Sequence, residues 1–289
     1  MKDAWGKWGE ADERGALNHI GAPQVRNAAQ LVRQGRTISL AQQISATMPV
    51  PSSRPGVMHF MNRDGGDYAA GRRRPGGFQF ADDTVVMPLH AGTHLDALCH
   101  CWYDDMLYNG FSATEVKSNG AARLGVQQLG PIATTGVLLD FVALNGGPLA
   151  DGFAIGPNMV QAAIERSGAL LAKGDAVLLR TGWQERSAAG EPVNFDNEPG
   201  LDREAGLLLA EAGVALVGAD NFAVEVLPFR AGTVFPVHQC LIRDHGVVLL
   251  EGLELAELAA QNVARFLFVA AALPIRGATG SPVNPVAIL

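Results

Sequence analysis

The sequence predicts an α/β fold, organised as a single domain over residues 1–289. From Gly136 onward, short apolar runs alternate with segments of helical spacing, which is typical of α/β proteins. Apolar residues make up 48% of the chain and charged residues 18%, so a sizeable core is expected and disorder is not. The sequence shows no internal repeat and no linker long enough to mark a domain boundary.

The second half of the chain supplies most of the expected elements. The apolar runs expected to be strands are residues 137–140, 175–179, 214–217, 247–250 and 266–272. The segments expected to be helices are residues 159–172, 202–212 (with Asp202 as N-cap), 237–244 and 253–260. In open α/β sheets, functional sites form at the carboxyl ends of the strands.

Residues 1–80 are rich in turns and carry little periodicity. We expect only a short helix at residues 27–34 and a strand at residues 37–44 in this part. The segment is therefore interpreted as a loop-rich N-terminal extension packed on the domain.

Charge and cysteine usage exclude several classes of partner. Lys and Arg total 22 against 29 Asp and Glu, which gives a net charge of −7 and disfavours nucleic acid. The basic run at residues 72–74 is interpreted as a flexible loop. Three cysteines and an N-terminus without an apolar signal core favour a reduced, cytoplasmic setting. Since no run of about 18 apolar residues occurs, no membrane span is expected.

The densest chemical signal lies between His90 and His100. Within these eleven residues, His90, His94, Asp96 and His100 are potential metal ligands, and the whole chain has only seven histidines. Imidazole and carboxylate groups together suit Zn²⁺ or Mn²⁺. The segment therefore predicts a metal site.

The spacing of these residues requires a bend in the chain. In a straight strand, at ~3.3 Å per residue, His90 and Asp96 would lie roughly 20 Å apart. In a helix, His90 and His94 would share a face but Asp96 would point away. Gly92 permits backbone angles that other residues avoid. We therefore predict a kinked strand or loop with Gly92 at the corner and with His94 and Asp96 facing the same way.

One short motif cannot easily enclose an ion, so remote ligands are expected. His238 and Glu251 are two candidates, and Glu251 follows an expected strand. Asp220, which also ends a strand, and Glu225 are further candidates. Each of these residues taken alone is more often structural than a ligand.

The motif resembles the HxGTHxDxxxH signature of the metal-dependent cyclase family. That family includes bacterial kynurenine formamidases, isatin hydrolases and related hydrolases of lactones and imides. Three further segments resemble the family's GDxVLxRTGW strand, its second ligand block and its GxxGSPVxP segment. They are residues 174–183, residues 235–238 through 251–253, and residues 277–285. The N-terminal region resembles a longer branch of the family.

The resemblance implies a mixed or barrel-like sheet core with flanking helices, similar to the swivelling β/β/α fold. It implies that His100 is the acid/base group and that one or two Zn²⁺ or Mn²⁺ ions bind. The implied metal ligands are His90, His94, Asp96, His238 and Glu251. Retention of Glu251 favours two ions, whereas Leu98 and Gly252 stand where the family commonly has Pro and Asn. A homodimer or homotetramer is implied as well.

The expected function is hydrolysis of a C–N or C–O bond in a small amide, imide or lactone, with a cyclic one favoured, by metal-activated water. In this hypothesis His100 takes a proton and returns it to the leaving group. The alternatives are a kynurenine formamidase, a ring-closing dehydratase and a non-catalytic metal-binding protein.

Substrate contacts are open to more than one interpretation. Trp102, Tyr103 and Tyr108 either stack on a substrate ring or pack in the core. Phe60, Phe78 and Phe80 are candidates for a lid, and the arginines at residues 72–74 are candidates for a substrate carboxylate. Cys99 and Cys101 are expected to be packing residues.

Overall fold

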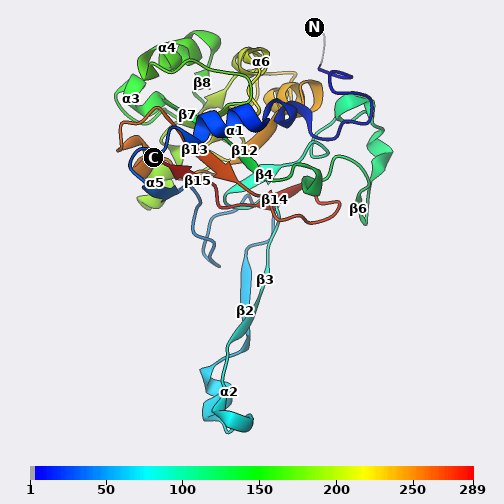
Figure 1. The fold of residues 1–289 in the computed structure, drawn as a ribbon, viewed down its shortest axis with the longest axis vertical. Coiled ribbons are helices and arrows are strands. Elements are labelled where there is room, and N and C mark those ends of the chain that lie inside the picture. The colour runs from blue at the N-terminus through cyan, green and yellow to red at the C-terminus, as the bar shows by residue number, and fades with distance from the viewer. Residues whose placement is uncertain (1–3) are drawn as a thin grey trace.

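The computed structural model describes residues 4–289 and contains one large curled sheet with flanking helices (Figure 1). Its nine strands within the described residues are, in spatial order, β1 (Thr37–Ser39), β15 (Val286–Ile288), β13 (Arg265–Ala270), β7 (Ile132–Asp140), β9 (Ala176–Arg180), β11 (Leu216–Ala219), β12 (Val248–Glu251), β4 (His94–Asp96) and β14 (Gly280–Pro282). The predicted α/β class with a mixed, half-barrel sheet is confirmed.

The centre of the sheet is parallel and its flanks are antiparallel. Strands β7, β9, β11 and β12 run parallel to one another. On one side β13, β15 and β1 continue the sheet with antiparallel pairing, and on the other side β4 and β14 do so. Because β4 is antiparallel to β12, its first residue lies at the same edge as the carboxyl end of β12.

Helices cover the sheet. Helix α4 (Pro157–Ser167) packs against β7 and lies between α3 (Phe141–Asn145) and α6 (Arg203–Ala212) (Figure 1). Helix α1 (Ala22–Ala29) packs against β7 and β13. The remaining helices are α2 (Gly65–Ala69), α5 (Trp183–Ala188), α7 (Pro236–His238), α8 (Ala256–Ala259), the 3-10 turns η1 (Gly15–His19), η2 (Pro75–Gly77), η3 (Tyr108–Gly110), η4 (Ala113–Glu115) and η5 (Val126–Gln128), and the π-helix η6 (Gln239–Asp244).

The remaining strands form two-stranded sheets: β2 (Met58–Arg63) with β3 (Asp82–Val86), β5 (Val116–Lys117) with β6 (Gly120–Ala121), and β8 (Ala154–Ile155) with β10 (Gly200–Leu201). Most buried apolar residues of the body form one continuous core beneath the large sheet's helices, and Met48, Val57 and Ala91 form a separate small cluster. None of the helices in residues 4–289 combines the length and the apolar character that a bilayer crossing requires.

The expected elements of the second half are found within a few residues of their predicted positions. Asp202 is the N-cap of α6, and its side chain accepts a hydrogen bond from the backbone NH of Ala205 at 2.8 Å. The helix predicted at residues 27–34 is wrong in position, because the helix spans Ala22–Ala29. Pro23 lies in its first turn, where proline is favoured, and this start signal was overlooked.

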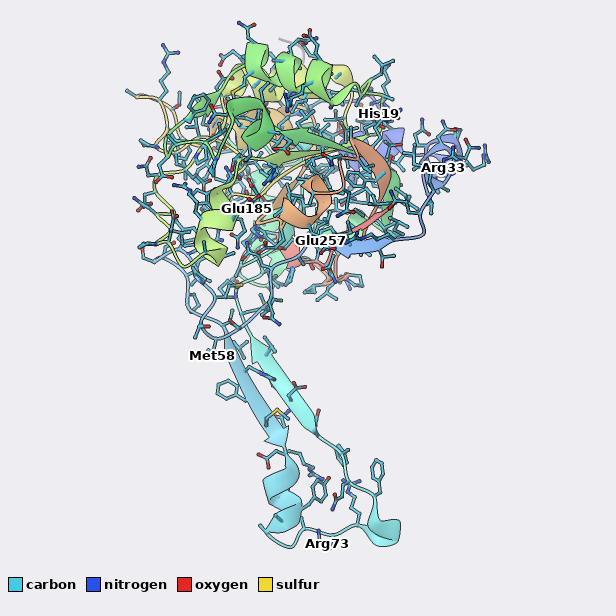
Figure 2. All side chains as sticks on the ribbon, turned by 90° about the vertical axis from the view of Figure 1, so that its left-hand side faces the viewer. His19, Arg33, Met58, Arg73, Glu185 and Glu257 are labelled. Carbon is cyan, nitrogen blue, oxygen red and sulfur yellow. The ribbon has the colours of Figure 1, made fainter. Side chains whose placement is uncertain are left out.

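A hairpin extends far from the body of the molecule (Figures 1 and 2). We call residues 58–86 the arm: β2 and β3 form its two-stranded stem, and α2 and η2 lie in its tip. Figure 2 places Met58 at the base of the arm and Arg73 at its far end. Within the segment interpreted as the N-terminal extension, β1 joins the large sheet, whereas β2 belongs to the arm.

Candidate metal centre

Strands β12 and β4 position the first residues of the centre. Glu251 is the last residue of β12, and it lies directly opposite His94 in the antiparallel pair with β4. Residues directly opposite each other in such a pair project their side chains from the same face of the sheet. Asp96, two residues after His94, faces that side too. Two strands therefore bring one imidazole and two carboxylates together at the carboxyl end of β12.

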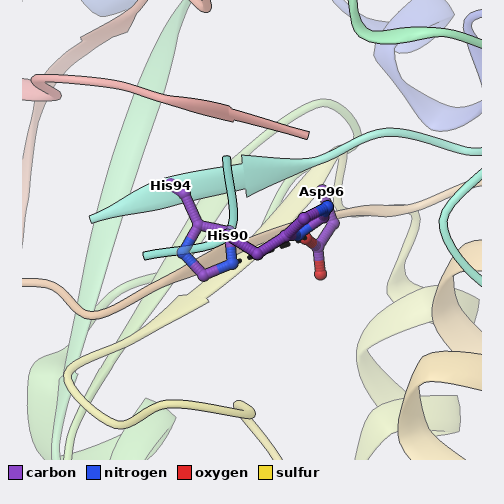
Figure 3. Close-up of side chains that lie close together, drawn as sticks. All are labelled: His90, His94 and Asp96. Atoms are coloured by element: carbon purple, nitrogen blue, oxygen red, sulfur yellow. Dashed lines mark hydrogen bonds and ion pairs between the residues drawn. The ribbon is translucent and has the colours of Figure 1, made fainter. Parts of the chain in front are cut away.

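Gly92 forms the predicted corner. Its φ is +61°, in the left-handed region, and a Cβ there would lie 2.9 Å from Sδ of Met48. The turn folds His90 back over the strand, so that its Nδ1 lies 2.7 Å from Oδ1 of Asp96 (Figure 3). The prediction of a bend at Gly92, with His94 and Asp96 on one face of an extended segment, is confirmed.

Strand β14 leaves room for His90. Gly280 pairs with Asp96, and a Cβ at Gly280 would lie 2.5 Å from Cε1 of His90. The neighbouring Thr279 places its Oγ1 3.0 Å from Nε2 of His90. The imidazole of His90 is thus held between Asp96 and Thr279.

His238 enters from the other half of the chain. It ends α7, just before the π-helix η6, and its Nδ1 lies 2.5 Å from Oε1 of Glu225. Glu225 also accepts hydrogen bonds from the backbone NH groups of Val237 and His238, at 3.1 Å each. This carboxylate therefore fixes the imidazole with Nε2 directed at Glu251 Oε1, 3.3 Å away, and Asp96 Oδ2, 3.7 Å away.

Several buried polar atoms at this point have no hydrogen-bond partner within the described chain. They are Nε2 of His94, Oδ2 of Asp96 and Oε1 of Glu251. His94 donates its Nδ1–H to the carbonyl of Gly92 at 2.9 Å, which leaves the lone pair on Nε2 free for another ligand. Buried polar atoms normally find a partner. A shared cation would supply one to all three.

The ligand atoms gather in two groups that share Asp96. Potential ligand atoms of His90, His94 and Asp96 lie within 4.8 Å of one another, and so do those of Asp96, His100 and His238. Glu251 contacts both groups, with Oε2 3.2 Å from Nε2 of His94. The donor set of imidazoles and carboxylates fits a divalent cation such as Zn²⁺ or Mn²⁺.

Both carboxylates of the centre are held in the ionised form. Burial alone would raise the pKa of Asp96, but the imidazoles of His100, His90 and His94 hold it below its ordinary value. Burial and Asp96 likewise raise the pKa of Glu251, yet the close imidazoles of His238 and His94 outweigh them and lower it. Two buried negative charges so close together favour a positive charge between them.

His100 occupies a different position from the other histidines. Its ring stacks on that of His90 with the centroids 4.1 Å apart, and its Nε2 lies 3.9 Å from Oδ2 of Asp96. The His100 side chain is 28% exposed, against 13% for His90 and 6% for His238. Burial lowers the pKa of His100 to about 4, which keeps the ring neutral at pH 7. A neutral, partly exposed imidazole at the rim can accept a proton.

A cavity opens beside the centre. Its walls include His90, His94 and Glu251, and the aromatic residues Trp183, Phe195 and Phe222 with the amides Gln42 and Gln184. A wider cavity of about 510 Å³ shares Pro51, Phe195 and Phe222 with it. The space directly beside the ligand atoms is only about 30 Å³, and the wider cavity next to it has the size that small-molecule sites occupy.

Other candidates from the sequence lie outside this cavity. Asp220 caps the turn after β9, since its carboxylate accepts hydrogen bonds from the backbone NH groups of Thr181 and Gly182. Tyr108 is fully buried and bonds to Asp12, and Tyr103 bonds to Asp244. These residues are structural.

The fold also shows where the candidate lid residues, the candidate arginines and the two cysteines near the motif lie. Phe60, Phe78, Phe80 and the arginines at residues 72–74 belong to the arm or its tip, which runs away from the body. Burial raises the pKa of Cys99 to about 12 and that of Cys101 to about 11, so both are poor nucleophiles. Packing is thus the role that the geometry gives these cysteines.

Sequence reasoning missed several residues of the site. Thr279 and the aromatic walls Trp183, Phe195 and Phe222 carry no local signal, because only the folded chain brings them to the His90 motif. Glu225 is a candidate in the sequence because it lies close to Asp220, but its contact with His238 forms only in the folded chain.

Comparisons with known proteins identify the family of the chain. The model of the cyclase family, described as "Putative cyclase", matches residues 38–226, which include the His90–His100 motif. A crystal structure of a novel cyclase is 36% identical, with a TM-score of 0.94 and coverage of 100% of each chain. No curated protein sequence matches the chain.

More distant solved structures share the fold. Isatin hydrolase A from Ralstonia solanacearum is 23% identical with a TM-score of 0.62, and covers 87% of this chain and 91% of its own. An isatin hydrolase bound to the product analogue thioisatinate is 20% identical with a TM-score of 0.64, covering 93% and 99%. A predicted metal-dependent hydrolase from Bacillus stearothermophilus is 20% identical with a TM-score of 0.58, covering 87% and 97%. On the family match and the 36% identical structure, the chain belongs to the cyclase family.

Proposed function

We propose that this protein is a metal-dependent hydrolase that cleaves a C–N or C–O bond in a small cyclic amide, imide or lactone. The observation that carries the proposal is the set of buried, unpartnered ligand atoms on His94, Asp96 and Glu251, of which His94 and Glu251 line a cavity. Similar folds occur in proteins named isatin hydrolase and metal-dependent hydrolase, which supports the same class of reaction.

The proposed ligands are the residues that converge at the end of β12. They are His90, His94, Asp96, His238 and Glu251. A Zn²⁺ or Mn²⁺ ion bound there would make hydroxide available near pH 7 and polarise a substrate carbonyl. Asp96 belongs to both groups of ligand atoms, which supports a centre that would hold two ions.

His100 is the proposed acid/base group. It lies at the rim of the centre, with its ring parallel to that of His90, and its lowered pKa of about 4 leaves it neutral at pH 7. In this role it takes a proton from the attacking water and delivers it to the leaving nitrogen or oxygen.

The cavity walls support a flat, uncharged substrate. Trp183, Phe195 and Phe222 offer ring faces for stacking, and the amides of Gln42 and Gln184 offer hydrogen bonds to carbonyl and NH groups. Arg54, the cation of the wider cavity, already bonds to the carbonyl of His90 and lies 5.0 Å from the Phe222 ring centroid. A substrate carboxylate would have to compete with these contacts.

The test is a hydrolysis panel on protein of measured metal content. Protein loaded with Zn²⁺ or Mn²⁺ is offered aromatic cyclic imides, lactones and N-formyl aromatic amides, including N-formyl-kynurenine. We expect hydrolysis of a cyclic aromatic substrate, and loss of it after removal of metal with a chelator.

Two results would contradict the proposal in different ways. Stoichiometric metal with no hydrolysis of any compound would favour a non-catalytic metal-binding protein. Hydrolysis confined to N-formyl-kynurenine would favour a kynurenine formamidase and would overturn the preference for an uncharged ring. The variant His19→Ala, far from the cavity, serves as the control for general damage by loss of a histidine.

A further inference from the structure

The arm exposes apolar side chains along both of its strands. Met58, Phe60 and Met61 of β2 are 44%, 51% and 48% exposed, and Val85 and Val86 of β3 are 50% and 49% exposed. A two-stranded hairpin by itself is marginally stable in water. A hairpin with solvent on both faces and unpaired edges is also a template for association. Burial of these apolar side chains against a partner would therefore stabilise the arm.

The strand register divides the arm into two unequal faces. Met58 is directly opposite Val86, and Phe60 lies two residues along, so these three side chains share one face, which we call the apolar face. On the opposite face the side chain of His59 contacts that of Asp83, with Nε2 2.6 Å from Oδ2. The apolar face is thus the one that gains most from being buried.

Charge distinguishes the tip of the arm from the remainder of the chain. Residues 63–80 contain four arginines and two aspartates, a net charge of +2. Asp82 and Asp83 lie in the stem of the arm, and the chain outside the arm has 18 basic and 25 acidic residues, a net charge of −7. A positive tip and a negative body attract each other when they belong to two copies of this chain.

We propose that the arm packs by its apolar face on the body of a second copy of this chain. A protein interface of standard size involves about 20–30 residues a side and buries about 800 Å² per partner. The arm spans residues 58–86, and its apolar face would contribute part of such an interface. In a two-fold dimer each chain extends its arm to the other, and the contact is made twice.

The arm also connects to the metal centre. Arg54, just before β2, donates a hydrogen bond to the carbonyl of His90, and the four residues 87–90 lead from β3 to His90 itself. Fixing the arm on a second copy would fix both ends of this loop. The inference concerns association alone, does not rest on hydrolysis, and is tested without substrate.

Sedimentation of the full-length purified protein provides the first test. We expect a dimer, and we expect Phe60→Asp to weaken its dissociation constant at least 30-fold, since a charge would enter the buried face. The matched control is Met61→Asp, which adds the same charge to a neighbouring residue of similar exposure on the opposite face. Its dissociation constant should stay within about threefold of wild type. Far-UV circular dichroism verifies that both variants are folded.

Crosslinking then identifies what the arm touches. Val86→Cys, made together with Cys101→Ser, places a thiol on the apolar face, because Cys101 is only partly buried whereas the native Cys99 and Cys240 are fully buried. A maleimide–diazirine reagent at this thiol, in a mixture of ¹⁴N- and ¹⁵N-labelled protein, should join arm peptides to body peptides of the opposite label.

Four results would overturn the proposal. They are a monomeric wild-type protein at every concentration tested, an unchanged dissociation constant for Phe60→Asp, equal weakening by Met61→Asp, and crosslinks confined to one label or to arm–arm pairs. Association that requires an added different protein would point to another partner and would overturn it as well.

Discussion

At the scale of single residues, the centre separates groups that hold a cation from groups that move a proton. His94 and His238 each use Nδ1 for a hydrogen bond to the protein, which directs Nε2 inward. His100 has no such anchor and lies at the rim, 28% exposed. This difference in anchoring is the basis for two predictions.

The variant His100→Ala should retain its metal but lose activity. Because His100 is assigned to proton transfer, we expect turnover to fall by about 100- to 10,000-fold. The measurement is kcat for the substrate found in the panel, together with metal content by plasma mass spectrometry. A variant that loses its metal would show that His100 is a ligand.

Glu225 should raise the metal affinity of the centre through its contact with His238. Glu225→Gln keeps the shape but removes the negative charge beside Nδ1, 2.5 Å away. Loss of such a supporting carboxylate typically weakens metal affinity about 10- to 100-fold. Competition with a fluorescent chelator measures the affinity. An affinity equal to that of the surface control Glu211→Gln would show that Glu225 has no such effect.

At the scale of elements, the centre depends on how β14 pairs with β4. Gly280 lies opposite Asp96, and its missing side chain is the space that the His90 ring fills. Three strands from distant parts of the chain, β12, β4 and β14, must therefore pair in one register to build the centre.

The variant Gly280→Ala tests this packing. The added methyl would lie 2.5 Å from Cε1 of His90, so His90 must move. We expect metal affinity and hydrolysis to fall at least tenfold while the far-UV circular dichroism spectrum is retained. Gly147→Ala is the control, because a Cβ at Gly147 meets no atom within 4 Å. Equal behaviour of the two variants would contradict the role of Gly280.

The sequence was informative where structure is local. The bend at Gly92 and the shared face of His94 and Asp96 follow from spacing within one short segment, and the buried strands follow from their apolar runs. His238 and Glu251 lie far along the chain: the residues alone offered them only as candidates beside Asp220 and Glu225, and the family resemblance singled them out. Their convergence is set by strand pairing, which spacing does not encode.

The arm was not predictable from sequence for a physical reason. Alternation of apolar and polar residues marks a strand with one buried face, but β2 and β3 are exposed on both faces. Residues 51–77 therefore read as irregular turns. The role of exposed apolar side chains such as those of Phe60 and Val85 becomes apparent only when the folded hairpin and a partner are considered together.

At the scale of the whole molecule, the centre joins the two halves of the chain. The first half supplies His90, His94 and Asp96, and the second half supplies His238 and Glu251, so a cation bound to all of them is a crosslink present only in the folded state. Ligands that bind the folded state alone stabilise it by mass action.

Metal should therefore raise the stability of the protein. At a free Zn²⁺ or Mn²⁺ concentration 100 times the dissociation constant, the expected gain is about 2.7 kcal/mol. Thermal unfolding of chelator-treated protein, with and without added metal, measures this gain. His94→Ala should abolish it, and a melting temperature that metal leaves unchanged in the wild type would argue against a structural link between the halves.

The central claim is that these five side chains bind a divalent cation at the carboxyl end of β12. Anomalous diffraction from crystals grown with Mn²⁺ or Zn²⁺ tests it most directly. The account predicts an anomalous peak within about 2.0–2.3 Å of Nε2 of His94, an oxygen of Asp96 and Nε2 of His238. A metal-loaded crystal with its peak elsewhere, and with these three residues free of it, would contradict the account.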